Sequence, residues 1–380
     1  MTCRLAVNML VLNGESVLRR CLLPLKGIID ELVVVDSGST DNTQHVLEEL
    51  ATEMKLARFY YETMHPFSQD FITDEPDTWQ LSFPSYSGRR LLKDWAAARN
   101  RALDCTHADY ILKLDADDEP ISSPENWLRT VACLDAMPDV SIIAAPYEIR
   151  NTEKSTSWIS MYDRMWRRVP VSGDPPLRWT MTIHEYLLGK TTKNTLYTAQ
   201  GLRVCDWRDS PGAGVRVDHR NLKTLLWDHE NNHHSKDDPN LEIVRLFTLA
   251  HEAADVFPEL AIGLLEIVAF RLEKTDVGIL SDCHYHRARA MEALGHIGAA
   301  ILLYEEADQI SLHVQALLRE YAMVVRAGEL EGLTHRAAAA SPRLCKLREK
   351  IFAKVGTDPL GSVPLNCDLG LLAKVRADCG

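Results

Sequence analysis

The sequence lacks the features that mark membrane and secreted proteins. It has no run of about 18 consecutive apolar residues, which excludes a membrane-spanning helix. Its first residues, MTCRLAVNMLVLNGE, contain neither a basic leader nor a small-residue cleavage site. Nine cysteines occur without a CxxC pair or a regular spacing, so we interpret them as reduced core residues. These absences predict a cytoplasmic protein.

The sequence also lacks a surplus of positive charge. Lys and Arg number 42 against 54 Asp and Glu, which gives a formal net charge of -12. A general attraction to nucleic acid or to an anionic membrane is therefore not expected, and an acidic partner would need a local basic patch. The 380 residues, 46% of them hydrophobic, are enough for two globular domains.

The first part of the chain alternates strand and helix patterns. Apolar runs such as RLAVNMLVL, ELVVVD and YILKLD predict buried strands, and stretches such as DWAAARNRAL have the composition of helices. This alternation predicts an α/β domain with a mostly parallel sheet, whose ligands lie beyond the carboxyl ends of the strands. Residues 63–93 are rich in Pro, Ser and aromatic residues without a sustained period, which indicates an insertion or flap beside the site.

The second part of the chain lacks strand signals. Leu, Ala and Val recur there at helical spacing, and Gly295, Ala300, Tyr304 and Ala307 fit the second half of a tetratricopeptide unit. We expect an α-helical, repeat-like domain at 216–380 behind a first domain at 1–215. Three histidines in DHENNHHSKDD are interpreted as part of a polar loop, because no ligand frame accompanies them.

An acidic cluster follows one predicted strand. In ADYILKLDADDEP an apolar segment runs directly into Asp115, Asp117, Asp118 and Glu119. Aspartates at i and i+2 offer oxygens to one hard divalent ion, and Mg²⁺ or Mn²⁺ held in this way usually also takes phosphate oxygens from a substrate. A lone D-x-D pattern is weak evidence, since acidic turns after strands are common.

Four segments strengthen this interpretation. NMLVLNGESVLRRCL, ELVVVDSGSTDNT, WAAARNRAL and YILKLDADDEP, in this order, resemble the nucleotide-sugar-binding half of family-2 glycosyltransferases of the GT-A fold. RMWRRVPVSGDPPLRWTMTIHEYLLG resembles a segment of one branch of that family, which often carries helical repeats. The resemblance implies inverting sugar transfer from a nucleotide-sugar, with a UDP-linked sugar as the expected donor and Mn²⁺ or Mg²⁺ as the expected ion.

The resemblance also implies roles for individual residues. Asp36 corresponds to the aspartate that bonds the nucleotide base, and Asp115 to the acid that faces ribose or sugar hydroxyls. The other residues implied to border the donor are Asn13, Glu15, Ser37, Ser39, Asp41, Arg99 and Asn100. Each of these also has an ordinary interpretation as a helix cap, a turn residue or a solvated side chain.

Metal ligands and a base are implied in the same way. Asp117 would bind the metal, and His184 would be a third ligand or a diphosphate contact. Glu185 is the first choice for the base that removes the acceptor proton, followed by Asp163 and Asp206. Where family members of this branch place a histidine, the chain has VCDWRDSPGAG, so Asp206 is the substitute oxygen ligand or the function is lost.

These observations predict a metal-dependent inverting glycosyltransferase. The expected acceptor is a protein, peptide or other glycoconjugate docked partly on the helical domain, and a homo-oligomer is one alternative use of that domain. A modified nucleic acid would need a basic stripe, for which the candidates are Arg89, Arg90, Arg164, Arg167, Arg168 and Arg178. The alternative from another class is a non-catalytic protein that keeps the nucleotide fold and recruits a partner through its helices.

Overall fold

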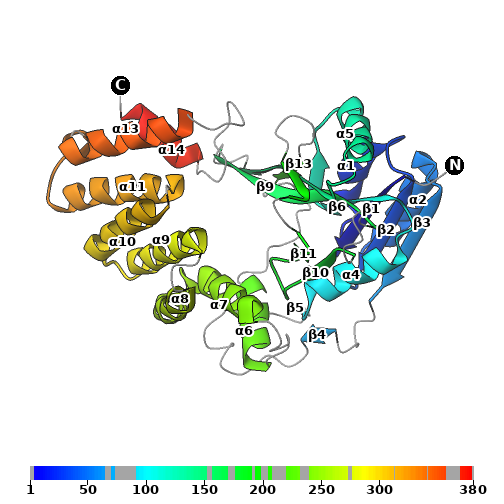
Figure 1. The fold of residues 1–380 in the computed structure, drawn as a ribbon, viewed down its shortest axis with the longest axis horizontal. Helices are drawn as coiled ribbons and strands as arrows, with labels where there is room; N and C mark the ends of the chain where they lie inside the picture. Colours follow the sequence, from blue (N-terminus) through cyan, green and yellow to red (C-terminus); the bar gives the residue numbers. More distant parts are fainter. Residues whose placement is uncertain are drawn as a thin grey trace. The chain divides into compact units, whose positions relative to one another are not determined.

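A computed structural model of the 380-residue chain describes most of it. The described residues are 4–64, 70–72, 91–151, 156–169, 176–190, 193–197, 204–207, 220–231, 239–272, 276–311, 313–339, 341–356 and 369–378. The chain forms two compact units (Figure 1). The first comprises residues 1–155 and 160–228, and the second comprises residues 156–159 and 229–380.

The first unit is built on a nine-stranded sheet with the order β3-β2-β1-β6-β9-β8-β13-β7, and β12 pairs with β8. Its strands are β1 (Leu5–Val11), β2 (Glu31–Asp36), β3 (Arg58–Thr63), β6 (Tyr110–Asp115), β7 (Asp118–Pro120), β8 (Ile142–Asn151), β9 (Thr156–Arg167), β12 (Thr195–Tyr197) and β13 (Val204–Trp207). Strand β1 pairs in parallel with both β2 and β6, whereas β6 pairs antiparallel with β9. The mostly parallel α/β class expected from the sequence is confirmed.

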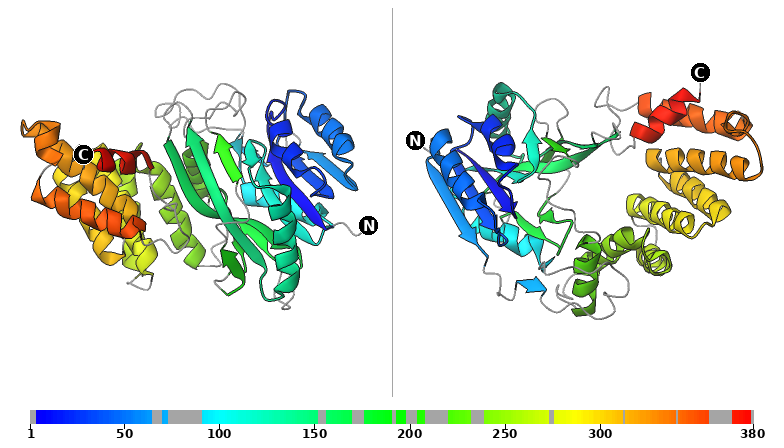
Figure 2. Two further views of the ribbon diagram at one scale, coloured as in Figure 1. Left: turned by 90° about the horizontal axis from the view of Figure 1, so that it is seen from above. Right: turned by 180° about the vertical axis from the view of Figure 1, so that it is seen from behind.

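Helices cover both faces of this sheet (Figures 1 and 2). They are α1 (Leu18–Leu22), α2 (Thr43–Met54), α4 (Trp95–Cys105) and α5 (Pro124–Ala136), and a further helix, α6 (Arg220–Asn231), begins at the end of the unit. Alternation along β1 explains the arrangement, because successive side chains of a strand point to opposite faces. Val7 and Met9 pack in one core with α1, α2 and α5, whereas Leu10 packs in a second core with α4.

Three parallel strands therefore end at one edge of the sheet. The registers align Val11 of β1 with Asp36 of β2, and Leu10 with Asp115 of β6. Ligand sites of such sheets form where the strands end and the following loops begin. Both aspartates predicted to bind the donor lie at this edge.

The predicted insertion is only partly described. Short strands β4 (Phe71–Ile72) and β5 (Leu91–Leu92) pair antiparallel and lie in this segment. Residues 65–69 and 73–90, with Arg89 and Arg90, lie outside the described residues. A second small ribbon pairs β10 (Arg178–Thr180) with β11 (Tyr186–Leu188). The turn between its strands carries His184 and Glu185.

The second unit is helical, as the sequence predicts. Its helices are α7 (Pro239–Ala253), α8 (Pro258–Leu272), α9 (Val277–Ala293), α10 (Ile297–Ile310), α11 (Val314–Leu330), α12 (His335–Ala339), α13 (Pro342–Gly356) and α14 (Leu369–Ala377). The expected tetratricopeptide half corresponds to the α9–α10 pair, where Gly295 adopts φ +78° in the turn. Ala300, Tyr304 and Ala307 are fully buried in the core of this unit. His229 lies on α6, and His233 and His234 lie outside the described residues.

Candidate functional site

The loops after β1 and β2 are joined by side-chain hydrogen bonds to backbone groups. The Asn13 backbone N–H donates to Ser39 Oγ at 2.8 Å, and Thr40 N–H donates to Asn13 Oδ1 at 2.8 Å. Asn13 adopts φ +53°, a conformation that asparagine tolerates better than most residues. Ser37 Oγ donates to the carbonyl of Val11 at 3.1 Å. The predicted donor-binding residues of these loops thus lie together and hold one another.

Two acids add further hydrogen bonds between the loops after β1 and β2, which we call the clasped loops. Glu15 accepts from the backbone N–H and side-chain amide of Asn42, at 3.1 and 2.9 Å. Asp41 Oδ2 accepts from the N–H of Glu15, and Asp41 Oδ1 accepts from the N–H of Thr43 at the start of α2. The carboxylates of these two residues therefore connect the loop after β1 to the start of α2.

Asp36 is fully buried at the end of β2. Its Oδ1 accepts from the backbone N–H groups of Gly38 and Ser39 at 2.8 and 2.7 Å, and its Oδ2 accepts from Tyr61 Oη at 2.6 Å. Burial and the bond to Asp36 raise the pKa of Tyr61 to about 12. Sequence reasoning missed Tyr61, which lies on β3, the strand paired with β2.

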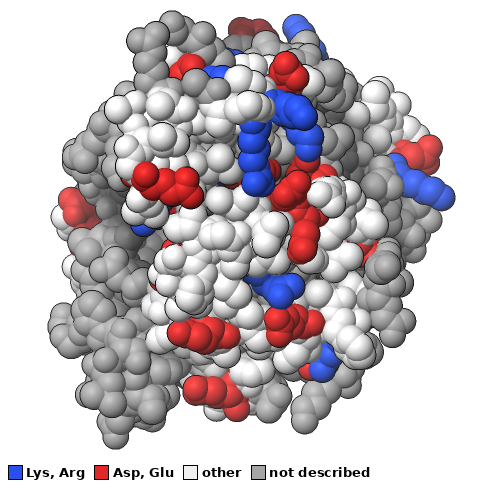
Figure 3. All heavy atoms as spheres, turned by 90° about the vertical axis from the view of Figure 1, so that its left-hand side faces the viewer, with Lys and Arg blue, Asp and Glu red and all other residues white. Residues whose placement is uncertain are grey.

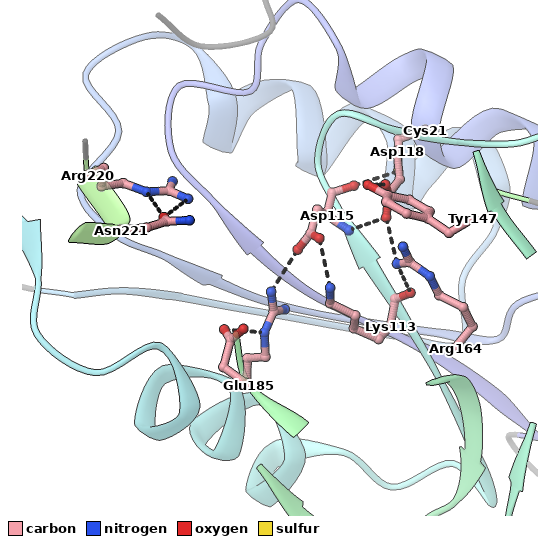
Figure 4. Close-up of polar contacts among 10 residues, drawn as sticks. Cys21, Lys113, Asp115, Asp118, Tyr147, Arg164, Glu185, Arg220 and Asn221 are labelled. Carbon is pink, nitrogen blue, oxygen red and sulfur yellow. Dashed lines mark hydrogen bonds and ion pairs between the residues drawn. The ribbon is translucent and has the colours of Figure 1, made fainter. Parts of the chain in front are cut away.

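Asp115 lies between two cations. Its Oδ1 accepts from Arg99 Nη2 and its Oδ2 from Lys113 Nζ, both at 2.8 Å. Arg99 also donates from Nε to Glu185 Oε1 at 2.9 Å, so one buried guanidinium joins α4, β6 and the turn before β11. Figure 4 shows Asp115 facing Lys113 on one side and the guanidinium that reaches Glu185 on the other.

Burial and charge act against each other in this group. Burial raises the pKa of Asp115, but the charges of Lys113, Arg99 and Arg164 outweigh it and hold that pKa well below its usual range. Burial, reinforced by the charge of Arg99, lowers the pKa of Lys113. The pKa of Arg99 is raised, because the charges of Glu185 and Asp115 outweigh its burial. The sequence signal for Lys113 is its place two residues before Asp115, on the same face of β6.

Asp118, one of the four acids that follow the predicted strand, supports the turn from inside the protein. Its side chain is fully buried, and Arg164 Nη1 donates to Oδ2 at 2.9 Å. Tyr147 Oη donates to Oδ1 at 2.9 Å, and the backbone N–H of Asp115 donates to Oδ2 at 2.8 Å. Burial raises the pKa of Asp118 despite the opposing charge of Arg164. Asp118 therefore fixes the turn that carries Asp115 and Asp117. The prediction that Arg164 belongs to an exposed basic stripe is wrong, because its side chain is buried against Asp118.

Asp117 lies at the tip of this turn and is partly exposed. Arg20 Nη2 donates to its backbone carbonyl at 3.2 Å, and Cys21 Sγ contacts the carbonyl of Asp115 at 3.5 Å, so α1 supports the turn from below. Burial, followed by the negative charges of Asp118, Asp117 and Asp115, raises the pKa of the Cys21 thiol well above its usual value. That thiol is a packing group.

The remaining predicted residues have separate environments. The Asn100 amide donates to the carbonyl of Trp179 and accepts from its N–H, at 2.9 and 3.0 Å, which anchors β10 to α4. Asp163 accepts from Lys190 Nζ at both oxygens, at 2.6 and 2.9 Å. His184 is exposed with φ +54°. Asp206 pairs through its backbone with Asp118, and its side chain lies outside the described residues.

A metal ion would depend on the substrate for most of its ligands. Among the described residues, no three His, Cys, Asp or Glu side chains form a group that could hold one. Mg²⁺ and Mn²⁺ sites at phosphate substrates often use only one or two carboxylates, with phosphate oxygens and water supplying the rest. Asp117 fits that pattern, whereas both oxygens of Asp115 already contact cations.

Part of the chain is similar to known proteins. Residues 7–63 match the family model described as glycosyl transferase family 2. A TPR repeat-containing protein of Synechococcus elongatus is 30% identical over 127 residues, which is 33% of this chain and 24% of the relative. The chain therefore spans about a quarter of that protein. Separately, none of the helices in the described part of the chain combines the length and the apolar composition of a membrane span.

Solved glycosyltransferase structures are similar at low identity. S. aureus TarS, residues 1–349, is 13% identical, covering 87% of this chain and 92% of that chain with a TM-score of 0.36. The mannosyltransferase PcManGT from Pyrobaculum calidifontis, in complex with GDP-Man and Mn²⁺, is 13% identical over 82% of this chain and 81% of that chain, with a TM-score of 0.37. The family match over residues 7–63 extends from β1 to the end of β3 and includes Asp36 and both clasped loops.

Proposed function

We propose that the protein is a glycosyltransferase of the GT-A type that moves a sugar from a UDP-linked nucleotide-sugar to an acceptor. The observation that carries the proposal is the position of the Asp115–Arg99–Glu185 network beside a segment that matches the family-2 model. The network lies at the carboxyl end of β6, and the matched segment supplies the two neighbouring loop ends at β1 and β2. Parallel sheets bind nucleotides at this edge.

The clasped loops supply a rigid border for the nucleotide. The side chains of Asn13, Glu15, Ser39 and Asp41 are engaged with backbone groups of the opposite loop, which limits the conformational entropy lost on binding. Asp36 is proposed to bond the base once the turn that buries its side chain gives access, since a carboxylate can accept more bonds than the three it has here. Asp115 faces the ribose or sugar hydroxyls in the same way.

Asp117 is the residue that would hold Mn²⁺ or Mg²⁺ in this proposal. When bound, the ion neutralises the charge that develops on the departing diphosphate. The chain's contribution is to keep the Asp117 turn fixed, through Asp118 beneath it and Arg20 against its backbone. His184 is exposed on the neighbouring turn and remains a candidate for a ligand or diphosphate contact.

Glu185 is the proposed base. Arg99 Nε holds Oε1, which leaves Oε2 to accept the proton of the acceptor hydroxyl as that oxygen attacks the anomeric carbon. Asp163 is less suited, because Lys190 contacts both of its oxygens. Direct attack from the side opposite the leaving diphosphate inverts the anomeric configuration, so the product anomer distinguishes this mechanism from a double displacement.

The acceptor is proposed to be a protein, peptide or glycoconjugate that contacts the helical unit. Stacked helix pairs present extended surfaces to such partners. The face drawn in Figure 3 carries acidic and basic side chains interspersed, with no extended field of one sign among the described residues. Arg167 and Arg168 donate to the backbone carbonyls of Val140 and Ala108, and Arg178 pairs with Asp104. These engagements favour a protein or glycan over a nucleic acid.

A donor screen tests the proposal. The purified protein is incubated with a panel of UDP-, GDP- and other nucleotide-sugars, with Mn²⁺ or with chelator, and the released nucleoside diphosphate is measured. We expect release with one donor class, which candidate acceptors stimulate. Asp117→Ala should abolish metal-dependent donor binding and turnover while the circular dichroism spectrum is retained. Lack of binding or release with every donor would reject the function, and full Asp117→Ala activity in chelator would reject the metal mechanism alone.

A further inference from the structure

Lys113 carries a largely buried amine to which the sequence pattern assigned no role. It lies on β6, two residues before Asp115, and its side chain is 14% exposed. It lines a small cavity together with Asn8, Arg99 and Trp179, between the sheet and α4. Burying an ammonium group is costly unless a partner compensates its charge. Asp115 is that partner, at 2.8 Å.

A second cation contacts Asp115 because the guanidinium of Arg99 is shared between Asp115 and Glu185. Its Nη2 contacts Asp115 and its Nε contacts Glu185, so it cannot also grip both oxygens of Asp115 as a bidentate partner. Lys113 takes the second oxygen from another direction. The two contacts together fix the plane of the Asp115 carboxylate, and the four charges of Arg99, Lys113, Asp115 and Glu185 sum to zero.

Loss of Lys113 would remove the contact that holds Oδ2 of Asp115 in place. Asp115 could then rotate toward Arg99 and take both ends of the guanidinium, in competition with Glu185. Asp115, whose side chain is 32% exposed, would also lose one of the two cations that balance its charge. Both effects change the direction in which the remaining lone pairs of Asp115 point, and these lone pairs are the ones that a nucleotide ribose would use.

We infer that Lys113 is a positioning residue for the donor: its ammonium group fixes the Asp115 carboxylate in the orientation that binds the hydroxyl groups of a nucleoside diphosphate or nucleotide-sugar. This inference rests on the proposed function and adds a residue to it. Lys113 acts through Asp115 and contacts no reacting atom.

The test measures nucleotide affinity by isothermal titration at one fixed Mn²⁺ concentration, with UDP and GDP as probes. Lys113→Met should weaken binding of the preferred nucleotide by about tenfold or more, as expected for one lost charge-assisted hydrogen bond. Lys113→Arg should restore much of the affinity, because it keeps a charged donor and the adjacent cavity offers room. If Lys113→Met does not fold, Lys113→Gln is measured in its place, since it keeps an N–H donor without the charge.

Lys223→Met is the matched control. Lys223 is 1% exposed on α6, so its replacement also removes a buried amine, but it is not among the residues bonded around Asp115. We expect it to change the melting temperature without changing nucleotide affinity. Equal affinity of the wild type and Lys113→Met would overturn the inference and leave the proposed function intact. Equal losses in Lys113→Met and Lys223→Met, without rescue by arginine, would also overturn it. A wild type that binds no nucleotide rejects both the inference and the function.

Discussion

Two aspartates at the same edge of the sheet are stabilised in opposite ways. Asp36 is held by neutral donors, two backbone N–H groups and the Tyr61 hydroxyl. Asp115 is held by the cations of Arg99 and Lys113. In the sequence both show the same pattern, an aspartate at the end of an apolar run that predicts a strand. The surrounding strands and helices decide the difference.

The contrast separates a scaffold from a charge-coupled site. Neutral donors make Asp36 part of the turn that joins β2 to α2, where its removal disturbs local structure. Cations make Asp115 part of a network that also contains Glu185, where one change alters the charge balance of several groups. Perturbed ionisable groups gather at functional sites more often than elsewhere. The Asp115 side of the edge is therefore where we expect chemistry.

The largest expected effect is on turnover, on the Asp115 side. Glu185→Gln keeps an oxygen for Arg99 Nε but removes the proton acceptor. We expect donor affinity to be retained and kcat to fall by about 10²–10⁴-fold, the usual contribution of a general base. Single-turnover transfer and donor titration measure the two quantities separately.

Asp163→Asn is the control for this prediction. Its carboxylate is already engaged by Lys190, so we expect a much smaller change in kcat. A normal rate for Glu185→Gln with a large loss for Asp163→Asn would transfer the role of base to Asp163. Retention of the donor's anomeric configuration in the product, measured by NMR, would reject direct displacement altogether.

The next effect is on stability and compares the Asp115 side of this edge with the Asp36 side. Asp118→Ala leaves the buried Arg164 without its carboxylate, and loss of one partner of a buried ion pair costs about 3–5 kcal/mol. Asp118→Ala also removes the acceptor of the Tyr147 hydroxyl and of the Asp115 N–H. Asp36→Ala leaves two backbone N–H groups and one hydroxyl without an acceptor, at about 1–3 kcal/mol for each group that stays buried and unsatisfied, and it breaks no ion pair. Urea unfolding followed by tryptophan fluorescence should rank Asp118→Ala as the more destabilised variant. The reverse order would mean that charge pairing contributes little beneath the turn.

The sequence was sufficient for the fold class and for placing Asp36 and Asp115 at the carboxyl ends of parallel strands. Strand and helix periodicity, with acids after two strands, carries that information locally. It could not identify Asp118 as a buried structural acid, because its partners Arg164 and Tyr147 are 46 and 29 residues away in the chain. The same limit hid the bond from Tyr61 to Asp36, which are 25 residues apart on paired strands. The Asp115–Lys113 ion pair is local, because the two residues lie two positions apart on one face of β6, and sequence reasoning missed it although its signal was present.

The helical unit supplies a third kind of buried polar group. His286 of α9 is buried, and its ring stacks on that of His251 at 4.3 Å between centroids. Phe247 and Tyr285 pack edge-on against it, at 5.5 and 5.0 Å. Arg289 Nη1 lies 3.3 Å from Nδ1 of His286, and since a guanidinium only donates, Nδ1 accepts and the ring is neutral. Here the burial of a polar group is tolerated because it carries no charge.

The smallest expected effect is a pH dependence of this unit. Burial, followed by the charges of His251 and Arg289, lowers the pKa of His286 well below its usual value. The unfolded chain then binds a proton below about pH 6.5 that the folded unit does not, so stability is full above that pH and falls as the pH drops, by at most about 1.4 kcal/mol per pH unit. Hydrogen exchange of α7 and α9 peptides at pH 7.5 and 5.5, corrected for the intrinsic rate, measures the loss. In His286→Phe, which keeps an aromatic ring without a titrating group, the loss should be smaller.

His335 provides the opposite sign within the same unit. It is exposed between Glu329 and Asp378, and its hydrogen bonds to them raise its pKa. Its contribution is therefore present below about pH 6.5 and disappears as the pH rises through the raised value. His335→Gln should consequently make the acid loss of protection slightly larger, whereas His286→Phe makes it smaller. Identical pH profiles for the wild type and His286→Phe would show that the buried histidine takes up its proton without opening the helices, and the distinction between charge-paired and neutral burial in the two units would then fail.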